Sequence, residues 1–399
     1  MKTGCPARTA VQSAADYGVI LAEPQFSQEG NPMTRYTVGL DVHSKQSVFA
    51  IQDAEGRFTA RGSVPTTPEG FESLRTKHEL PPGTRVGLET GTVAFYAARL
   101  LLGLGLEPVV IDAHEVRLKA YRPTQKSDRR DAEEICEGLR RGIYRSIVHI
   151  PPPQITALRD TLSRRRHFVR LKTAEMNAVK RLLRSAGLGR QARSLRTLAG
   201  WEKLLAALAQ HIDLLEHVKR HQAVWRCADE QVVALDAQLA VQEVPFAEDV
   251  RRLQTVPGVG PIVALTTLAV LSDISRFPST KHAASYAGLV PSTHQSGDRD
   301  AHGRITKRGS AELRAMLCEA AHHASRPAHP LNPYFMSLCV RRGYKMAVVA
   351  VAHRLCRILF TMLRRRTDFD IKKLGIEVGP FEKTQVKLYR LRKAQAVQA

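Results

Sequence analysis

Three consecutive prolines, Pro151-Pro152-Pro153, divide this sequence into two parts with different patterns. Because proline lacks a backbone N–H and fixes φ, such a run can continue neither a helix nor a central strand. Before it, short strand-like runs alternate with helical runs, whereas residues 154–243 are typical of long helices. A chain of 399 residues is also too long for one ordinary core. The sequence therefore predicts two domains with connecting segments.

The part before the prolines is predicted to form a mixed α/β layer. Its elements are expected as strands at Tyr36–Val42, 47–52 and 58–64, a helix opened by Thr67-Pro68, a strand at Arg85–Glu89, a helix near 92–104, a strand at 108–112, and a helix from Ser127 to about Arg141. This order is typical of antiparallel strands that lead into parallel ones. In such a sheet the first and fourth strands are neighbours.

The remaining boundaries follow from composition and periodicity. Residues 1–33 show no periodicity, and we expect a disordered extension there. The domains are then predicted as an α/β domain over 34–150, a basic, coiled-coil-like helical region over 151–250, a mostly α-helical C-terminal domain over 251–370, and a basic tail over 371–399. In the middle region, apolar residues recur at steps of three and four, namely Leu204, Leu208, Ile212, Leu215, Val232, Leu235 and Leu239. Lys219 and Gln222 interrupt this seam.

The charge balance predicts a polyanionic partner. Sixty Lys and Arg against 38 Asp and Glu leave a formal net charge of +22 at pH 7, and each phosphate that such a protein neutralises releases counterions. Between Arg159 and Arg196, twelve basic residues stand against two acidic ones. We interpret this run, with Arg164, Arg165 and Arg166 at its densest point, as a nucleic-acid-binding segment. The alternatives are a solvated helix face, or a basic ribosomal or membrane-surface protein.

Cysteines and hydropathy indicate the compartment. The six cysteines form no C-x-x-C pair, which argues against a zinc site and against a disulfide framework and suits a reducing cytosol. Residues 1–32 lack the pattern of a signal peptide. The apolar stretch from Met346 to Leu363 is broken by His353, Arg354 and Arg357, and is typical of an amphipathic helix. We expect a cytoplasmic protein that contacts no membrane.

Four carboxylates form the candidate catalytic site. Asp41 lies on the first predicted strand, Glu89 ends the fourth, and Asp128 and Asp131 lie three apart at the start of a helix, on one face. If they converge, such close like charges require cations, and two Mg²⁺ ions about 3.5–4 Å apart would clamp a phosphodiester. Taken singly, an acid at the end of a strand is usually a turn or cap residue, and Asp128 could simply be the N-cap of its helix.

Three segments resemble the DEDD-type insertion-sequence transposases: 39–45 (GLDVHSK), 89–91 (ETG) and 126–132 (KSDRRDA). The resemblance implies an RNase H-like domain of the Holliday-junction-resolvase type. It places that family's metal ligands on Asp41, Glu89, Asp128 and Asp131. Lys126 would then face the scissile phosphate, although a surface lysine is an equal interpretation.

Residues 256–261 (VPGVGP), followed by an apolar run, resemble a helix-hairpin-helix turn. Gly258 and Gly260 would let backbone N–H groups approach a phosphate at a helix N-terminus. The alternative is an ordinary tight loop.

The block from Tyr286 to Gly309 resembles the C-terminal domain of the same transposases. In that family a serine of this domain is the nucleophile and forms a covalent link to DNA. The match falls on Ser296, with Ser292 as the second choice, and an ordinary loop serine as the alternative. The sequence 298–300 (DRD) departs from the family's usual glycine-and-lysine stretch. Arg304, Lys307 and Arg308 are candidate phosphate contacts.

Together these features predict a transposase or recombinase of a bacterial insertion sequence. Its carboxylates would hold Mg²⁺ while Ser296 attacks DNA, and strand exchange would follow. The resemblance also implies a non-coding guide RNA, a homo-oligomer (dimer or tetramer) and a place at the nucleoid. Two alternatives stay open: a hydrolytic junction-resolving nuclease that uses only the four carboxylates, and a non-catalytic DNA-binding protein.

Overall fold

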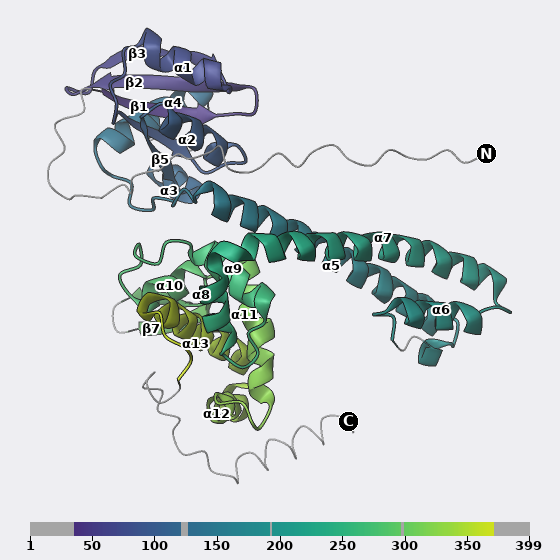
Figure 1. Ribbon diagram of the computed structural model, residues 1–399. Helices are drawn as coiled ribbons and strands as arrows, with labels where there is room; N and C mark the ends of the chain where they lie inside the picture. Colours follow the sequence, from purple (N-terminus) through teal and green to yellow (C-terminus); the bar gives the residue numbers. More distant parts are fainter. Residues whose placement is uncertain (1–35, 121–126, 192–193, 297–298, 371–399) are drawn as a thin grey trace, which may run out of the picture. The chain divides into compact units, whose positions relative to one another are not determined.

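A computed structural model describes residues 36–120, 127–191, 194–296 and 299–370 (Figure 1). The chain divides into two compact units between Ile150 and Pro151. The expected extension over 1–33, the tail over 371–399 and Lys126 lie outside the described residues.

The first unit is built on a five-stranded sheet with the order β3-β2-β1-β4-β5. The strands are β1 (Tyr36–Val42), β2 (Gln46–Asp53), β3 (Phe58–Pro65), β4 (Arg85–Glu89) and β5 (Glu107–Ile111). β1, β2 and β3 pair antiparallel, whereas β4 pairs parallel with both β1 and β5. The predicted change from antiparallel to parallel pairing, with the first and fourth strands adjacent, is therefore confirmed.

Helices cover both faces of this sheet. They are α1 (Pro68–Lys77), α2 (Ala94–Gly103), α3 (Ala113–Lys119) and α4 (Asp128–Arg140). Phe71 of α1 and Leu101 of α2 pack with Val38 and Leu40 of β1 in the main core. Thr67 caps α1 as expected, since its side chain accepts a hydrogen bond from Gly70 N. The sequence did not predict α3, because its seven residues bury only Val116 and leave no periodicity to detect.

Two paired glycines bring α4 close to the sheet. Gly39 of β1 and Gly87 of β4 are register partners. A Cβ on Gly39 would lie 2.1 Å from the Ala132 carbonyl oxygen, and one on Gly87 would lie 2.9 Å from Ile135. Gly39 therefore meets the α4 backbone itself, whereas Gly87 leaves room for the α4 side chains Ile135 and Leu139.

The second unit begins with a helical hairpin. It comprises α5 (Pro153–Ser185), the 3₁₀ turn Gly189–Gln191, α6 (Leu198–Ala207) and α7 (Ile212–Glu243). Helices α5 and α7 pack along their length (Figure 1). The buried α7 residues Val218, Trp225, Val232 and Leu239 recur every seven positions.

The apolar spacing across residues 204–215 has a different origin from the one expected. Leu204 and Leu208 pack in a small core with Trp201 and Trp225. Ile212, however, is 72% exposed, because α6 ends at Ala207 and α7 begins only at Ile212. Because the helix is interrupted between Ala207 and Ile212, a regular apolar spacing across this break does not place the residues on one helical face.

The rest of the second unit is a helical bundle with one hairpin of strands. Its elements are the 3₁₀ turn Val244–Phe246, α8 (Ala247–Gln254), α9 (Pro261–Leu271), α10 (Thr280–Tyr286), β6 (Pro291–Ser296), β7 (Arg299–Ile305), α11 (Ala311–His322), the 3₁₀ turn His323–Ser325, α12 (Asn332–Arg342) and α13 (Tyr344–Arg365). Leu158 of α5 and Leu239 of α7 belong to the bundle's core, so the base of the long hairpin shares it.

Helix α13 forms much of that core. By length and composition it is the one described helix that could cross a membrane, but 61% of its most apolar window is buried inside the unit. Leu355, Leu359 and Phe360 are almost completely buried. These features are those of a core helix.

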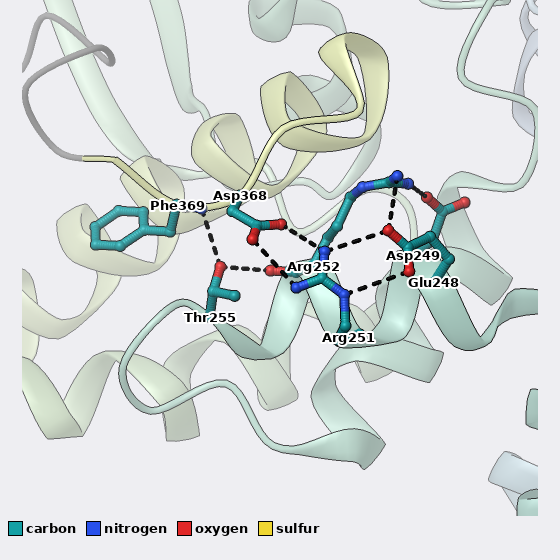
Figure 2. Close-up of polar contacts among 7 residues, drawn as sticks. All are labelled: Glu248, Asp249, Arg251, Arg252, Thr255, Asp368 and Phe369. Carbon is teal, nitrogen blue, oxygen red and sulfur yellow. Dashed lines mark hydrogen bonds and ion pairs between the residues drawn. The ribbon is translucent and has the colours of Figure 1, made fainter.

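The end of the described chain is tied to α8 (Figure 2). Arg251 donates two hydrogen bonds to Asp368, at 3.1 and 2.9 Å, and also binds Glu248. The Phe369 N–H donates to the Thr255 hydroxyl at 2.9 Å. Exposed ion pairs contribute little free energy, so these contacts chiefly fix where the chain leaves the bundle.

Candidate metal centre and nucleic-acid-binding residues

Asp41 and Glu89 lie at the same edge of the sheet. Strands β1 and β4 are parallel, and Leu40 pairs with Leu88. The next residues, Asp41 and Glu89, are therefore neighbours at the carboxyl ends of their strands. Side chains two apart on a strand share a face, so both point to the side on which α4 covers Gly39 and Gly87.

The start of α4 brings two more carboxylates to Asp41. Ser127 is the N-cap and accepts a hydrogen bond from Arg130 N, which fixes the first turn that carries Asp128 and Asp131. The helix N-terminus favours negative charge. The interpretation of Asp128 as the N-cap is therefore not supported, because Ser127 holds that position.

A histidine lies between two of the acids. His43 Nε2 is 3.2 Å from Asp41 Oδ2 and 3.5 Å from Asp128 Oδ2. One ligand atom each from Asp41, His43 and Asp128 lie within 4.8 Å of one another, a spacing that a metal ion could bridge. His43 was not among the site residues predicted from the sequence, although it lies only two residues after Asp41.

Electrostatics indicate that this cluster suits a cation. Burial raises the pKa of Asp41, and the charges of Asp131 and Asp128 raise it further, while His43 opposes them. Carboxylate oxygens crowded in this way are the ligands that hard divalent cations prefer. Asp128 and Asp131 thus lie close enough to Asp41 for their charges to raise its pKa.

Glu89 also interacts electrostatically with Tyr144, whose hydroxyl donates a hydrogen bond to α4. Burial raises the pKa of Tyr144 to about 12, and the charges of Glu134, Glu115 and Glu89 add to that rise. Glu89 therefore lies within electrostatic range of Tyr144. It stands at the end of the strand that is next to the strand of Asp41.

The three arginines selected on α5 differ in their surroundings. Arg165 donates from Nε to Asp236 Oδ1 at 2.5 Å and from Nη2 to Asp236 Oδ2. Arg166, with Arg170, lies near half-buried Glu312 and lowers its pKa against the larger effect of burial. Arg164 is exposed. Arg165 therefore holds α5 to α7, and Arg164 is the most available of the three.

The two glycines of the predicted helix-hairpin-helix turn have different roles. Gly258 has φ +87° and packs against the end of α11, where a Cβ would lie 2.9 Å from His323. Gly260 is the N-cap of α9, with Pro261 in the first turn, and nothing lies within 4 Å of where its Cβ would be. Packing therefore explains Gly258 and leaves Gly260 open to a ligand.

The candidate serines lie on one strand. Ser296 ends β6, and its backbone is opposite Arg299 of β7; its side chain lies outside the description. The Ser292 hydroxyl packs against Gly303, where a Cβ would lie 2.3 Å away. The hairpin was not predicted, because residues 291–305 carry little apolar alternation. Arg304, Lys307 and Arg308 are exposed beside it, and Lys307 has φ +56°.

A mixed five-stranded sheet, with acids at the ends of its first and fourth strands and at the start of the covering helix, fits the RNase H-like, DEDD class of nuclease domain. Comparison with known families agrees. A DEDD transposase model of the IS110 type matches residues 38–187, and the model described as "Transposase IS116/IS110/IS902 family" matches residues 250–335.

Curated relatives cover most of the chain. It is 31% identical over 314 residues to a "Probable family 20 transposase" of Pseudomonas aeruginosa, which covers 73% of this chain and 87% of the relative. It is 28% identical to the "Transposase for insertion sequence element IS1111A" of Coxiella burnetii, over 74% of this chain and 84% of the relative. A "Pilin gene-inverting protein" of Moraxella lacunata is 35% identical over 30% of this chain and 38% of the relative. The chain belongs to the IS116/IS110/IS902 family of transposases and is an enzyme that acts on DNA.

Proposed function

We propose that this enzyme moves or inverts its DNA element by metal-dependent cleavage and strand exchange. The observation that carries the proposal is the convergence of Asp41, Asp128 and Asp131 at one edge of the sheet, with Glu89 on the adjacent strand end. These four would hold Mg²⁺, with two ions in the full site. The metal would stabilise charge on the attacking and leaving oxygens of the phosphodiester. The four carboxylates would position the metal. Helix α4, which the paired glycines allow to approach the sheet, would keep the carboxylates in place.

The second unit would supply the nucleophile. Ser296 oxygen would attack the phosphorus, forming a phosphoserine ester and releasing one DNA hydroxyl end. A hydroxyl from the exchanged strand would then attack the same phosphorus and restore the serine. The position of Ser296 in the block that resembles the transposase C-terminal domain supports this role, and the match over residues 250–335 covers it.

The proposal also includes the nucleic-acid partners of the enzyme and its oligomeric state. DNA ends and target would bind both units, with Lys126, Arg164, Gly260, Arg304, Lys307 and Arg308 as candidate contacts. A non-coding RNA encoded with the element would guide target choice, and a dimer or tetramer would act on the DNA. The enzyme would work in the cytoplasm at the nucleoid.

The carboxylates are tested by Asp41→Asn. We expect transposition of a plasmid-borne element to fall at least about a hundredfold, because the metal supplies several kcal/mol of transition-state stabilisation. Binding of the element's DNA should stay largely intact. Asp53→Asn is the matched control, since Asp53 pairs with Arg57 at the β2–β3 turn. Unchanged transposition in Asp41→Asn would refute the metal site.

The serine is tested by Ser296→Ala, with Ser292→Ala as its control on the same strand. We expect Ser296→Ala to abolish both strand joining and the covalent protein–DNA adduct seen after denaturing electrophoresis, and Ser292→Ala to retain them. A Ser296→Ala enzyme that cleaves DNA without joining it would favour the second candidate, a hydrolytic junction-resolving nuclease that uses the carboxylates alone.

A further inference from the structure

Glu133 of α4 holds two arginines beside the candidate metal centre. Arg61 Nε donates to Glu133 Oε1 at 2.6 Å, and Arg129 Nε approaches the same oxygen at 3.1 Å. Arg129 follows Asp128 directly in the first turn of α4, and Arg61 reaches α4 from β3. The two guanidinium groups come from different elements and meet at one carboxylate.

The orientation of this triad, defined as Arg61, Glu133 and Arg129, is restrained. The Arg61 guanidinium lies 4.2 Å from the ring centroid of Phe58 and is only partly exposed. Glu133 accepts hydrogen bonds from both guanidinium groups, at 2.6 and 3.1 Å. With one carboxylate and two guanidinium cations, the triad carries one net positive charge.

The triad leaves hydrogen-bond donors free. Each arginine contacts Glu133 through Nε, and within the described residues no acceptor is recorded for the Nη groups of Arg61 or Arg129. A guanidinium presents five N–H donors in a planar fork that matches phosphate oxygens. The Arg129 side chain is 70% exposed. Its fork is therefore held in place on one side and open to solvent on the other.

We propose that Arg61 and Arg129 bind a backbone phosphate of the DNA strand that enters the carboxylate site, and that Glu133 positions them. This inference rests on the proposed function, because the carboxylates define which strand enters. Arg129 lies between Asp128 and Asp131 in sequence, in a turn whose helix dipole also favours an anion. The bound strand would therefore cross the start of α4 toward β3.

The test is a phosphate-interference scan that needs no cleavage. The full-length protein binds a synthetic four-way DNA junction in EDTA, with single phosphates near the branch point replaced one at a time by neutral methylphosphonates. In the unaltered protein we expect one or two positions to weaken binding about tenfold, as for loss of a charged hydrogen bond. In the Arg61→Gln/Arg129→Gln variant the native junction should bind about tenfold more weakly, and those positions should have no further effect.

Two further variants separate positioning from bulk charge. Arg140→Gln removes one positive charge, as the single variant Arg129→Gln does, but from the other end of α4, where Arg140 pairs with Glu137. It should leave the interference pattern unchanged. Glu133→Gln removes a negative charge; if charge alone mattered, it would tighten binding and keep the pattern. Positioning predicts instead that the sensitive positions disappear. The single variant Arg129→Gln repeats the test of the double variant while changing only an exposed side chain.

An unchanged pattern in the double variant, or a pattern that appears only when the junction is made of RNA, would overturn the inference. These results are separate from those of Asp41→Asn. If that variant transposes normally, the metal site is wrong while the phosphate contact stands; if the interference pattern does not change, the contact is wrong while the metal site stands.

Discussion

At the scale of single residues, ionisation couples the fold of the first unit to pH. Asp41 and Glu115 are both carboxylates near the sheet, but their surroundings act in opposite directions. Burial and neighbouring acids raise the pKa of Asp41. Burial also disfavours the Glu115 charge, but hydrogen bonds from Lys119 and from the backbone of Arg145 and Ser146 outweigh it and lower its pKa to about 2. The first arrangement suits binding a cation, and the second stabilises the fold.

Glu115→Gln should therefore destabilise the first unit in a pH-dependent way. The folded-state pKa lies below the ordinary value of 4.5, so the stabilisation is complete above about pH 4.5 and is lost as the pH falls toward 2. We expect a loss on the order of 2 kcal/mol at pH 7. The melting temperatures of the two proteins, followed by circular dichroism, should differ at pH 7 and converge near pH 2. A difference that persists at low pH would show that the charge of Glu115 is not the cause.

At the scale of elements, the site depends on how closely α4 approaches the sheet. The paired glycines on β1 and β4 remove two side chains that would otherwise separate them from the helix. The first turn of α4 then reaches the carboxyl ends of both strands. The proposed metal centre would thus depend on helix-on-sheet packing as much as on the acids themselves.

Gly39→Ala should destabilise the first unit by at least about 2 kcal/mol, because the new Cβ would meet backbone atoms that cannot move independently. Denaturant unfolding measures the change. Gly103→Ala is the control, since nothing lies within 4 Å of its Cβ position, and it should be close to neutral. Equal stability of Gly39→Ala and the unaltered protein would mean that α4 can shift away from the sheet at little cost.

At the scale of the whole molecule, the second unit contains two separate cores. The larger one joins the base of the long hairpin to the helical bundle. The smaller one lies where α5, α6 and α7 meet, and contains both tryptophans of the chain, Trp201 and Trp225, with ring centroids 5.6 Å apart. Cores that share no residues can lose their structure at different free energies.

Tryptophan fluorescence should therefore report on the smaller core alone. We expect its urea transition to precede the loss of helix seen by circular dichroism, because the smaller core has few buried residues. Trp201→Ala should lower the stability of this core by about 3–5 kcal/mol and remove hydrogen-exchange protection in α6 while α13 stays protected. Coincident transitions for both probes would instead indicate that the second unit unfolds as one cooperative body.

The order of the five strands and of helices α1, α2 and α4 in the first unit was determined by the sequence, as was the place of each acid on these elements. Local signals sufficed there: alternation marks strands, and Ser127 and Thr67 cap their helices within three residues. Tertiary structure decided the rest. Short elements such as α3 and the β6–β7 hairpin lack periodicity of their own. The exposure of Ile212, the pairing of Arg165 with Asp236, and the place of His43 between two acids depend on residues distant in the chain or on a neighbouring helix. Such contacts arise from packing, which spacing along one segment does not record.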